Sequence, residues 1–221
     1  METSTTSFIV ESLTRAIVEH RLLPGTKLAE QKLADHFGVS RTLVRQALFQ
    51  LSQNRLIRLE PARGAFVATP SVAEARQVFS VRRMLEAEMV RAFMAQSTPA
   101  KIRALRQHVA AEKKTMDEDL SQRTELPGDF HVRIAELMGN EVLAQLLGEL
   151  SSRCALITLM YPSTTAAEHS HDEHAEIVEA LGAGDADRAV QLMRQHLDNV
   201  EAGLAFDRDV PTNDLSMALS S

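Results

Sequence analysis

The sequence predicts a mainly α-helical protein, in which a small N-terminal domain with one β-hairpin precedes a domain made only of helices. Three observations predict this. Three short helical segments occupy the first 54 residues, two alternating segments rich in branched residues follow, and helical periodicity then continues to about residue 205. The 221 residues are 44% hydrophobic, which suffices for two cores. We place the domains at 1–70 and 71–205, followed by a tail, 206–221, that we expect to be mobile.

Local signals delimit the helices of the first domain. Apolar residues at helical spacing predict a first helix over 8–20, and the pair Pro24-Gly25 marks the turn after it. A second helix is expected over 29–36, where Gly38 can end it with a positive φ. Ser40 is a suitable N-cap for a third helix.

A β-hairpin is expected after the third helix. LIRLE and GAFVA alternate in polarity and enclose the segment PARG, with Gly64 in the turn. Three helices followed by such a hairpin form a winged helix-turn-helix, whose third helix fits the major groove of DNA.

The third helix carries a polar strip opposite its apolar face. In SRTLVRQALFQLS, residues 40–52, one side holds Arg41, Thr42, Arg45 and Gln46, and the other holds Leu43, Val44, Ala47, Leu48 and Leu51. An arginine there can bind guanine bidentately or hold a phosphate, and the sequence does not decide between them. The simpler alternative is a solvated helix surface. Ser40 with the helix N-terminus suits a phosphate, and Arg63-Gly64 suits the minor groove or the backbone.

Charge and composition narrow the possible partners. Residues 1–70 carry nine Lys or Arg and six Asp or Glu, whereas the remainder carries fifteen and twenty-four. A basic first domain on an acidic second one indicates that only the first meets an anion. Aromatic residues make up only 4%, so a base-stacking platform is not expected. No signal peptide is visible, and the apolar run CALITLMY is too short to span a bilayer.

The second domain is predicted to be a helical bundle. The expected helices are 72–96, 99–119, 127–138, 141–160, 171–182 and 186–204. Ser71 with Glu74 and Ser170 with Glu173 have the spacing of capping boxes, Thr98 precedes Pro99, and Asp185 is a suitable cap. The single cysteine, Cys154, excludes an internal disulfide, fits a reducing cytosol and is expected in the core.

Three histidines lie in step with apolar residues on three of these helices: His131, His174 and His196. A single buried histidine is most often a hydrogen-bonded core residue. Three on facing helices of one bundle can converge on a divalent metal ion, zinc or another transition metal. Spacing alone leaves both interpretations open.

The first domain resembles the DNA-binding domain of GntR-family bacterial transcription regulators. PG, L-A at 33–34, GVSRT-x-VR-x-AL and the later G-x-x-V occur in order within residues 8–68. The resemblance implies DNA contacts at Ser40, Arg41, Thr42, Arg45 and Gly64, with Gln31 as a further position. Leu43 stands where proline is common, Gln46 where glutamate is common, and Asn54-Arg55 replaces a polar residue and glycine.

The second domain resembles the all-helical FCD effector domain of the FadR-like branch. FH-x-x-(I/L)-A ending in GN, EH-x-x-(I/L) and M-R-x-H-L carry this resemblance over about residues 75–204. It implies that the three histidines are metal ligands. The family often has an aspartate four residues before the first one, where this sequence has Pro127. Asp129, His171, or water or effector remain as alternatives for that ligand position.

The resemblance also implies that Arg82 points inward and holds the carboxylate of an effector, which its fork of N–H donors suits. The simpler alternative is a surface ion pair with Glu86, four residues on. Together these features predict a cytoplasmic, homodimeric regulator of transcription that binds operator DNA and responds to a metal and a small carboxylate, with no membrane partner. The alternative from another class is a metal-dependent enzyme with a three-histidine zinc site. A nonspecific DNA-packaging protein conflicts with the acidic second domain.

Overall fold

The structure is a computed structural model, and it describes residues 5–117, 129–162 and 166–206. Within these residues two compact units can be distinguished. The first lies within Met1–Ala75, Ser152–Pro162 and Ala205–Ser221, and the second within Arg76–Ser151 and Ser163–Leu204. The first unit therefore extends beyond residue 70 and also takes in a later part of the chain. The predicted tail, apart from Phe206, lies outside the described residues.

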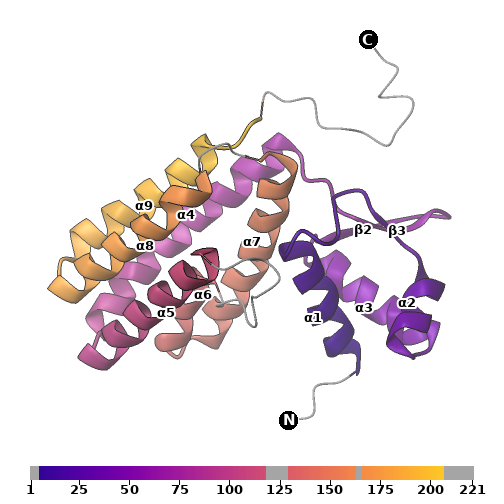
Figure 1. The fold of residues 1–221 in the computed structure, drawn as a ribbon, viewed down its shortest axis with the longest axis horizontal. Helices are drawn as coiled ribbons and strands as arrows, with labels where there is room; N and C mark the ends of the chain where they lie inside the picture. The colour runs from indigo at the N-terminus through magenta and orange to yellow at the C-terminus, as the bar shows by residue number, and fades with distance from the viewer. Residues whose placement is uncertain (1–4, 118–128, 163–165, 207–221) are drawn as a thin grey trace. The chain divides into compact units, whose positions relative to one another are not determined.

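The first unit contains the predicted winged helix-turn-helix (Figure 1). Its helices are α1 (Thr5–Val18), α2 (Glu30–Phe37) and α3 (Arg41–Gln53), and its strands are β1 (Lys27–Leu28), β2 (Ile57–Glu60) and β3 (Gly64–Val67). All pairing is antiparallel in the order β1-β3-β2. The predicted hairpin is confirmed as β2 and β3. The third strand, β1, was not predicted, because two residues are too few to show an alternating pattern.

The turn between α2 and α3 follows the predicted signals. Gly38 has φ +63°, in the left-handed region, and its N–H donates to the carbonyl of Ala34. Ser40 is the N-cap of α3, where its hydroxyl accepts from the N–H of Leu43. This turn directs α3 so that its apolar face packs into the core and its polar strip stays exposed.

The core of the first unit joins all its helices. Buried residues come from α1, α2, α3 and the sheet: Ile9, Leu13, Ile17, Ala34, Val44, Leu48, Leu51, Leu28, Ala65 and Val67. Leu156, from the segment 152–162, belongs to the same cluster and is only 1% exposed. Tyr161, from that segment, donates its hydroxyl proton to the carbonyl of Pro70 over 3.0 Å.

The remaining helices confirm the predicted all-helical second domain. They are α4 (Val72–Ala95), α5 (Pro99–Asp117), α6 (Phe130–Leu137), α7 (Glu141–Met160), α8 (Ala166–Ala183) and α9 (Ala186–Ala202). Thr98 accepts from the N–H of Lys101 and Asp185 from that of Arg188, so both predicted caps are present. Ser71 likewise accepts from the N–H of Glu74. In the second unit α8 packs against both α5 and α9 (Figure 1).

Three predicted helix starts differ from the structure, because α1 begins at Thr5 and not at 8, α6 at Phe130 and not at 127, and α8 at Ala166 and not at 171. The spacing of Ser170 and Glu173 predicted a helix starting at 171, but α8 begins at Ala166. Glu173 therefore lies inside the helix, where its carboxylate binds side chains of α9 instead of a backbone N–H.

The helix α7 is the one helix in the described part of the chain that is long and apolar enough to cross a membrane. From the sequence, only the apolar run CALITLMY at the end of this helix was considered, and it was judged too short to span a bilayer. Leu147 on α7 is buried in the core of the second unit and Leu156 in that of the first, although only 28% of the apolar window of this helix is buried. Cys154 on the same helix is buried, as predicted.

Candidate functional site

The polar strip of α3 is exposed, as the sequence predicted. Arg41, Thr42, Arg45 and Gln46 are all exposed, while Val44 behind them is fully buried. The side chains of Arg41 and Arg45 retain 54% and 61% of their accessible surface. Because the leucines of α3 fix the helix in the core, the two guanidinium groups project from a rigid support.

A carboxylate on α2 joins these two arginines. Oε2 of Glu30 accepts from Nη2 of Arg41 and from Nε of Arg45, each over 2.8 Å. The hydrogen bonds from Arg45 and then Arg41 lower the pKa of Glu30. Gln31, the neighbouring residue, donates from Nε2 to Oδ1 of Asp35 over 2.8 Å. Glu30 had no distinguishing sequence signal, because its partners lie on another helix.

The hairpin presents the other expected residues. Arg63 is exposed, pairs with Glu60 over 2.6 Å and lies with its guanidinium carbon 5.4 Å from the centroid of the Phe66 ring. Gly64 opens β3 opposite Glu60 with φ +102°, a conformation that other residues rarely adopt. A second arginine, Arg58, lies 3.3 Å from the same Glu60 carboxylate.

A groove of about 770 Å³ separates α3 from the hairpin. Arg45, Gln46 and the exposed ring of Phe49 line its α3 side, and Leu59 and Gly64 line its hairpin side. The groove thus brings the expected residues of the helix and of the hairpin to one surface.

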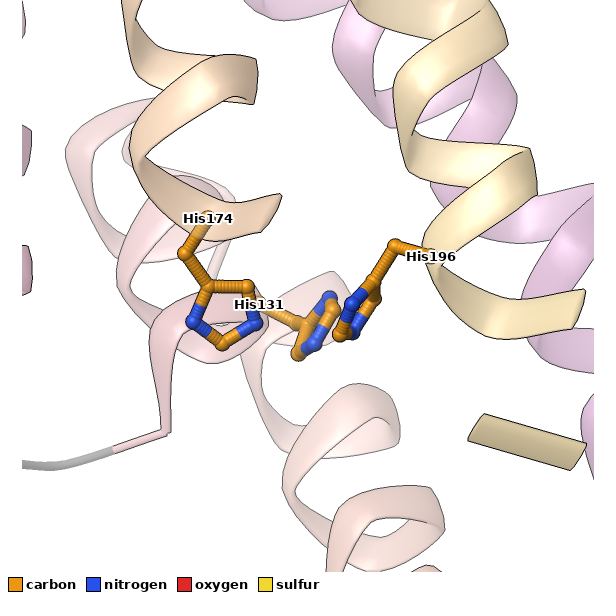
Figure 2. Close-up of side chains that lie close together, drawn as sticks. All are labelled: His131, His174 and His196. Carbon is orange, nitrogen blue, oxygen red and sulfur yellow. The ribbon is translucent and has the colours of Figure 1, made fainter. Parts of the chain in front are cut away.

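In the second unit the three predicted histidines come together (Figure 2). His131 lies on α6, His174 on α8 and His196 on α9, and all three are buried. One candidate ligand atom from each lies within 4.8 Å of the others. The ring centroids are 4.7 Å apart for His174 and His196 and 5.2 Å apart for His131 and His196. The convergence expected from spacing is therefore present.

Each imidazole has a glutamate at its Nδ1, and each glutamate comes from a different helix. Oε2 of Glu86 on α4 lies 2.5 Å from Nδ1 of His131. Oε2 of Glu112 on α5 lies 3.0 Å from Nδ1 of His174, and Oε2 of Glu173 on α8 lies 2.8 Å from Nδ1 of His196. None of the three had been assigned to the site from the sequence.

These carboxylates determine the chemistry of the rings. An ionised carboxylate that accepts a hydrogen bond from Nδ1–H, as Glu112 can at His174 and Glu173 at His196, leaves Nε2 as the lone-pair donor of a neutral imidazole. Burial lowers the pKa of His196 to about 4 and also lowers that of His174, with the glutamates only partly opposing it. Nε2 of His174 is buried and has no hydrogen-bond partner among the described residues. Three imidazole rings close together fit a divalent metal ion.

Arg82 is buried rather than on the surface. Its Nε donates to Oε1 of Glu86 over 2.6 Å, so the ion pair suggested by the four-residue spacing is present. The pair is buried and not on the surface, because Arg82 is only 5% exposed and Glu86 is fully buried. Burial alone would raise the pKa of Glu86, but the neighbouring His131 and Arg82 outweigh it and hold that pKa at about 2.

Of the residues considered for a fourth ligand, only Asp129 has a described side chain, and it caps a helix. Asp129 is the N-cap of α6, and its Oδ1 accepts from the N–H groups of His131 and Val132. This role uses the carboxylate for the backbone. Pro127 and the side chain of His171 lie outside the described residues.

Comparison with known protein families places both units. Residues 5–67 match the family described as bacterial regulatory proteins, gntR family, and residues 77–199 match the FCD domain. The second match covers more than half of the chain.

Individual relatives agree with these matches. The HTH-type transcriptional repressor GlaR of Escherichia coli is 31% identical over 196 residues, which covers 82% of this chain and 87% of the relative. The HTH-type transcriptional repressor RspR of the same species is 28% identical over 198 residues, covering 87% and 85%. A crystal structure of a putative GntR regulator from Rhodococcus shares 25% identity at a TM-score of 0.77, covering 90% of this chain and 97% of the other. These relatives are regulators and not enzymes, so the alternative of a three-histidine zinc enzyme is wrong.

Proposed function

The chain belongs to the gntR family of bacterial regulatory proteins and carries an FCD domain, and on that premise we propose how it is controlled. It is a cytoplasmic transcription regulator whose affinity for operator DNA depends on a small carboxylate bound at a metal-containing site in the helical domain. The observation that carries this proposal is the convergence of three buried histidines. One candidate ligand atom from each ring lies within 4.8 Å of those from the other two.

The DNA contacts are assigned to one surface of the first unit. Arg41, Thr42 and Arg45 of α3 enter the major groove, while Arg63 and Gly64 approach the minor groove or the backbone. The exposure of all five residues supports this assignment. The N-terminus of α3 at Ser40 faces a phosphate, and Gln31 contacts DNA after exchanging its bond with Asp35.

His131, His174 and His196 would hold the metal, each through Nε2. The three glutamates at Nδ1 orient the rings and increase their basicity, as outer-shell carboxylates do in other metal sites. The use of Asp129 as a helix cap favours a site with only three protein ligands. A divalent ion there would act as a Lewis acid towards a carboxylate effector or water.

Arg82 is the second contact of the effector. Its guanidinium group is buried and attached through Nε to Glu86, which itself lies beside His131. A small carboxylate that contacted both this arginine and a bound ion would satisfy two positive groups at once. Such a ligand controls DNA affinity only if it binds more tightly to one arrangement of the two DNA-binding units of a dimer than to another.

The proposal includes a homodimer, because a two-fold operator is read by two heads. Sedimentation at micromolar concentration, with and without DNA, measures the assembly. A strict monomer under both conditions would contradict this part.

The decisive test crosses metals with carboxylates on metal-stripped protein. A ligand that binds the native state raises its unfolding temperature, so the correct pair should raise it more than either component alone. DNA affinity is then measured with that pair. Arg45→Ala should lose roughly 1–3 kcal/mol of DNA binding in each half-site. Arg15→Ala, at an exposed position on α1, is the matched control and should bind normally. Normal DNA binding by a folded Arg45→Ala protein would overturn the assignment of α3.

A further inference from the structure

The DNA-facing arginines are already engaged before any DNA is present. Oε2 of Glu30 accepts from Nε of Arg45, and it also accepts from both Nε and Nη2 of Arg41, over 3.3 and 2.8 Å. One oxygen of one side chain thus holds two guanidinium groups that project from the next helix. The carboxylate is in the first turn of α2, so it approaches both arginines from the side of the protein.

The two arginines are held in different ways. Arg45 is held through Nε, which leaves its two terminal nitrogens as a fork with the spacing of the O6 and N7 acceptors of guanine. Arg41 is held through Nε and Nη2 together, so one whole edge of its guanidinium is occupied by the carboxylate. The terminal edge of Arg41, with one N–H from each of Nη1 and Nη2, stays open like that of Arg45.

Stability does not account for this arrangement. Arg41, Arg45 and Glu30 retain 54%, 61% and 27% of their side-chain surface, and exposed ion pairs contribute little to folding. The charge has a clearer effect on binding. Each phosphate that approaches Arg41 or Arg45 must compete with a fixed negative charge beside them, which disfavours contacts that are not rewarded by a correct base.

The hairpin repeats the arrangement. Glu60 lies 2.6 Å from the guanidinium of Arg63 and 3.3 Å from that of Arg58, and it lines the same groove as Glu30. The arginines expected to reach DNA from α3 and from the hairpin therefore each have a carboxylate partner within their own domain.

We propose that Glu30 is a positioning residue for DNA recognition, which holds the guanidinium groups of Arg41 and Arg45, directs the fork of Arg45 to a guanine, and weakens binding to unselected sequence. The inference rests on the proposed function and specifies which base the recognition helix reads. Glu30 acts through the arginines and needs no contact with DNA itself.

The test compares Glu30→Gln with Glu19→Gln in the full-length protein. Glu19 also pairs with an exposed arginine, Arg21, but this arginine lies on neither α3 nor the hairpin. Glu19→Gln therefore removes the same charge from a pair that is not expected to contact DNA. Two probes are used: the duplex that the wild-type protein enriches from a randomised pool, and a duplex of random sequence. Affinity for both is measured over a series of salt concentrations, and thermal unfolding verifies that each variant is folded.

Glu30→Gln should bind random duplex more tightly, with a salt dependence steeper by about one unit in each head. Its ratio of selected to random affinity should fall by roughly tenfold, and its own enriched site should lose preference for one guanine in each half-site. Arg45→Lys should lose the same guanine preference, because lysine lacks the fork. Glu19→Gln should match the wild type.

Two failures are distinguishable. If the wild type enriches a site and Glu30→Gln enriches it with the same ratio and salt dependence, only the role of Glu30 is overturned. If the wild type enriches no sequence at all, the proposed operator binding is overturned, and this inference with it.

Discussion

Nδ1 of His131 lies 2.5 Å from Oε2 of Glu86, and both side chains are buried. The other oxygen of the same carboxylate accepts from Nε of Arg82. One glutamate therefore connects the arginine proposed to hold an effector with a histidine proposed to hold a metal. A ligand that changes the position of Arg82 would therefore also change the position of His131, through the carboxylate of Glu86 alone.

Glu86→Gln should weaken metal binding by about 10–100-fold, as loss of an outer-shell partner does elsewhere. The neutral amide keeps the size of the side chain but no longer favours Nδ1–H on His131. Competition between protein and a zinc chelator measures the effect. Glu88→Gln, on the same helix with a largely exposed side chain, is the control. Equal zinc affinity in the two folded variants would argue against a metal at these histidines.

Replacing His174 and His196 together with alanine should remove the metal, because His131 cannot hold it alone. Basal DNA binding should survive, since the first unit has its own core. Elemental analysis of the purified protein and titration with the best carboxylate measure the two effects. Arg45→Ala should show the reverse pattern, with metal retained and DNA binding lost.

A different result would reassign the histidines. If the wild type responds to a carboxylate but binds no divalent metal under any condition, the three imidazoles bind the effector directly through hydrogen bonds.

The metal-free protein should become less stable as the pH falls from 7 to 4. Burial lowers the pKa of His196 from 6.5 to about 4 and lowers that of His174 as well. Between these pH values the unfolded chain binds protons that the folded chain excludes, so stability is complete above 6.5 and is lost towards 4. For His196 alone the loss is about 3 kcal/mol. Urea unfolding at several pH values measures it, and His196→Gln should flatten the dependence. A steep loss that His196→Gln leaves unchanged would exclude this residue as its source.

Arg55→Gly should stabilise the first unit by about 0.5–1 kcal/mol. Arg55 has φ +59°, a left-handed backbone conformation. This conformation is strained for a residue with a Cβ atom, whereas glycine adopts it without strain. Arg15→Gly, inside α1, should instead destabilise by about 1 kcal/mol. Chemical denaturation of the three proteins compares the two effects. A loss of stability in Arg55→Gly would mean that the side chain outweighs the strain.

Features set by neighbouring residues were predictable from the sequence. Ser40, Thr98 and Asp185 cap the expected helices because a cap joins a side chain to a backbone group only two or three residues away. The amphipathic pattern of α3 and the alternation of the hairpin strands likewise depend only on local periodicity.

Features that join distant segments were not predictable. Strand β1 exists because Lys27 pairs with Phe66, and no local pattern announces that partner. The capping-box spacing of Ser170 and Glu173 was misleading, because the helix begins earlier and Glu173 binds His196 instead. The carboxylates of Glu86 and Glu112 meet their histidines only after different helices pack together. The histidines themselves were found because each lies in step with the apolar face of its own helix.

The three histidines occupy α6, α8 and α9, so the cluster is built from widely separated parts of the chain. A ribosome adding about 5–20 residues per second reaches His196 several seconds after His131. Every residue proposed to touch DNA has been made well before either. Once Leu156, which completes the core of the first unit, has also been made, each molecule passes through an interval in which its DNA-binding unit can fold while α8 and α9 are still incomplete. A newly made regulator would be insensitive to its signal until its last described helix docks.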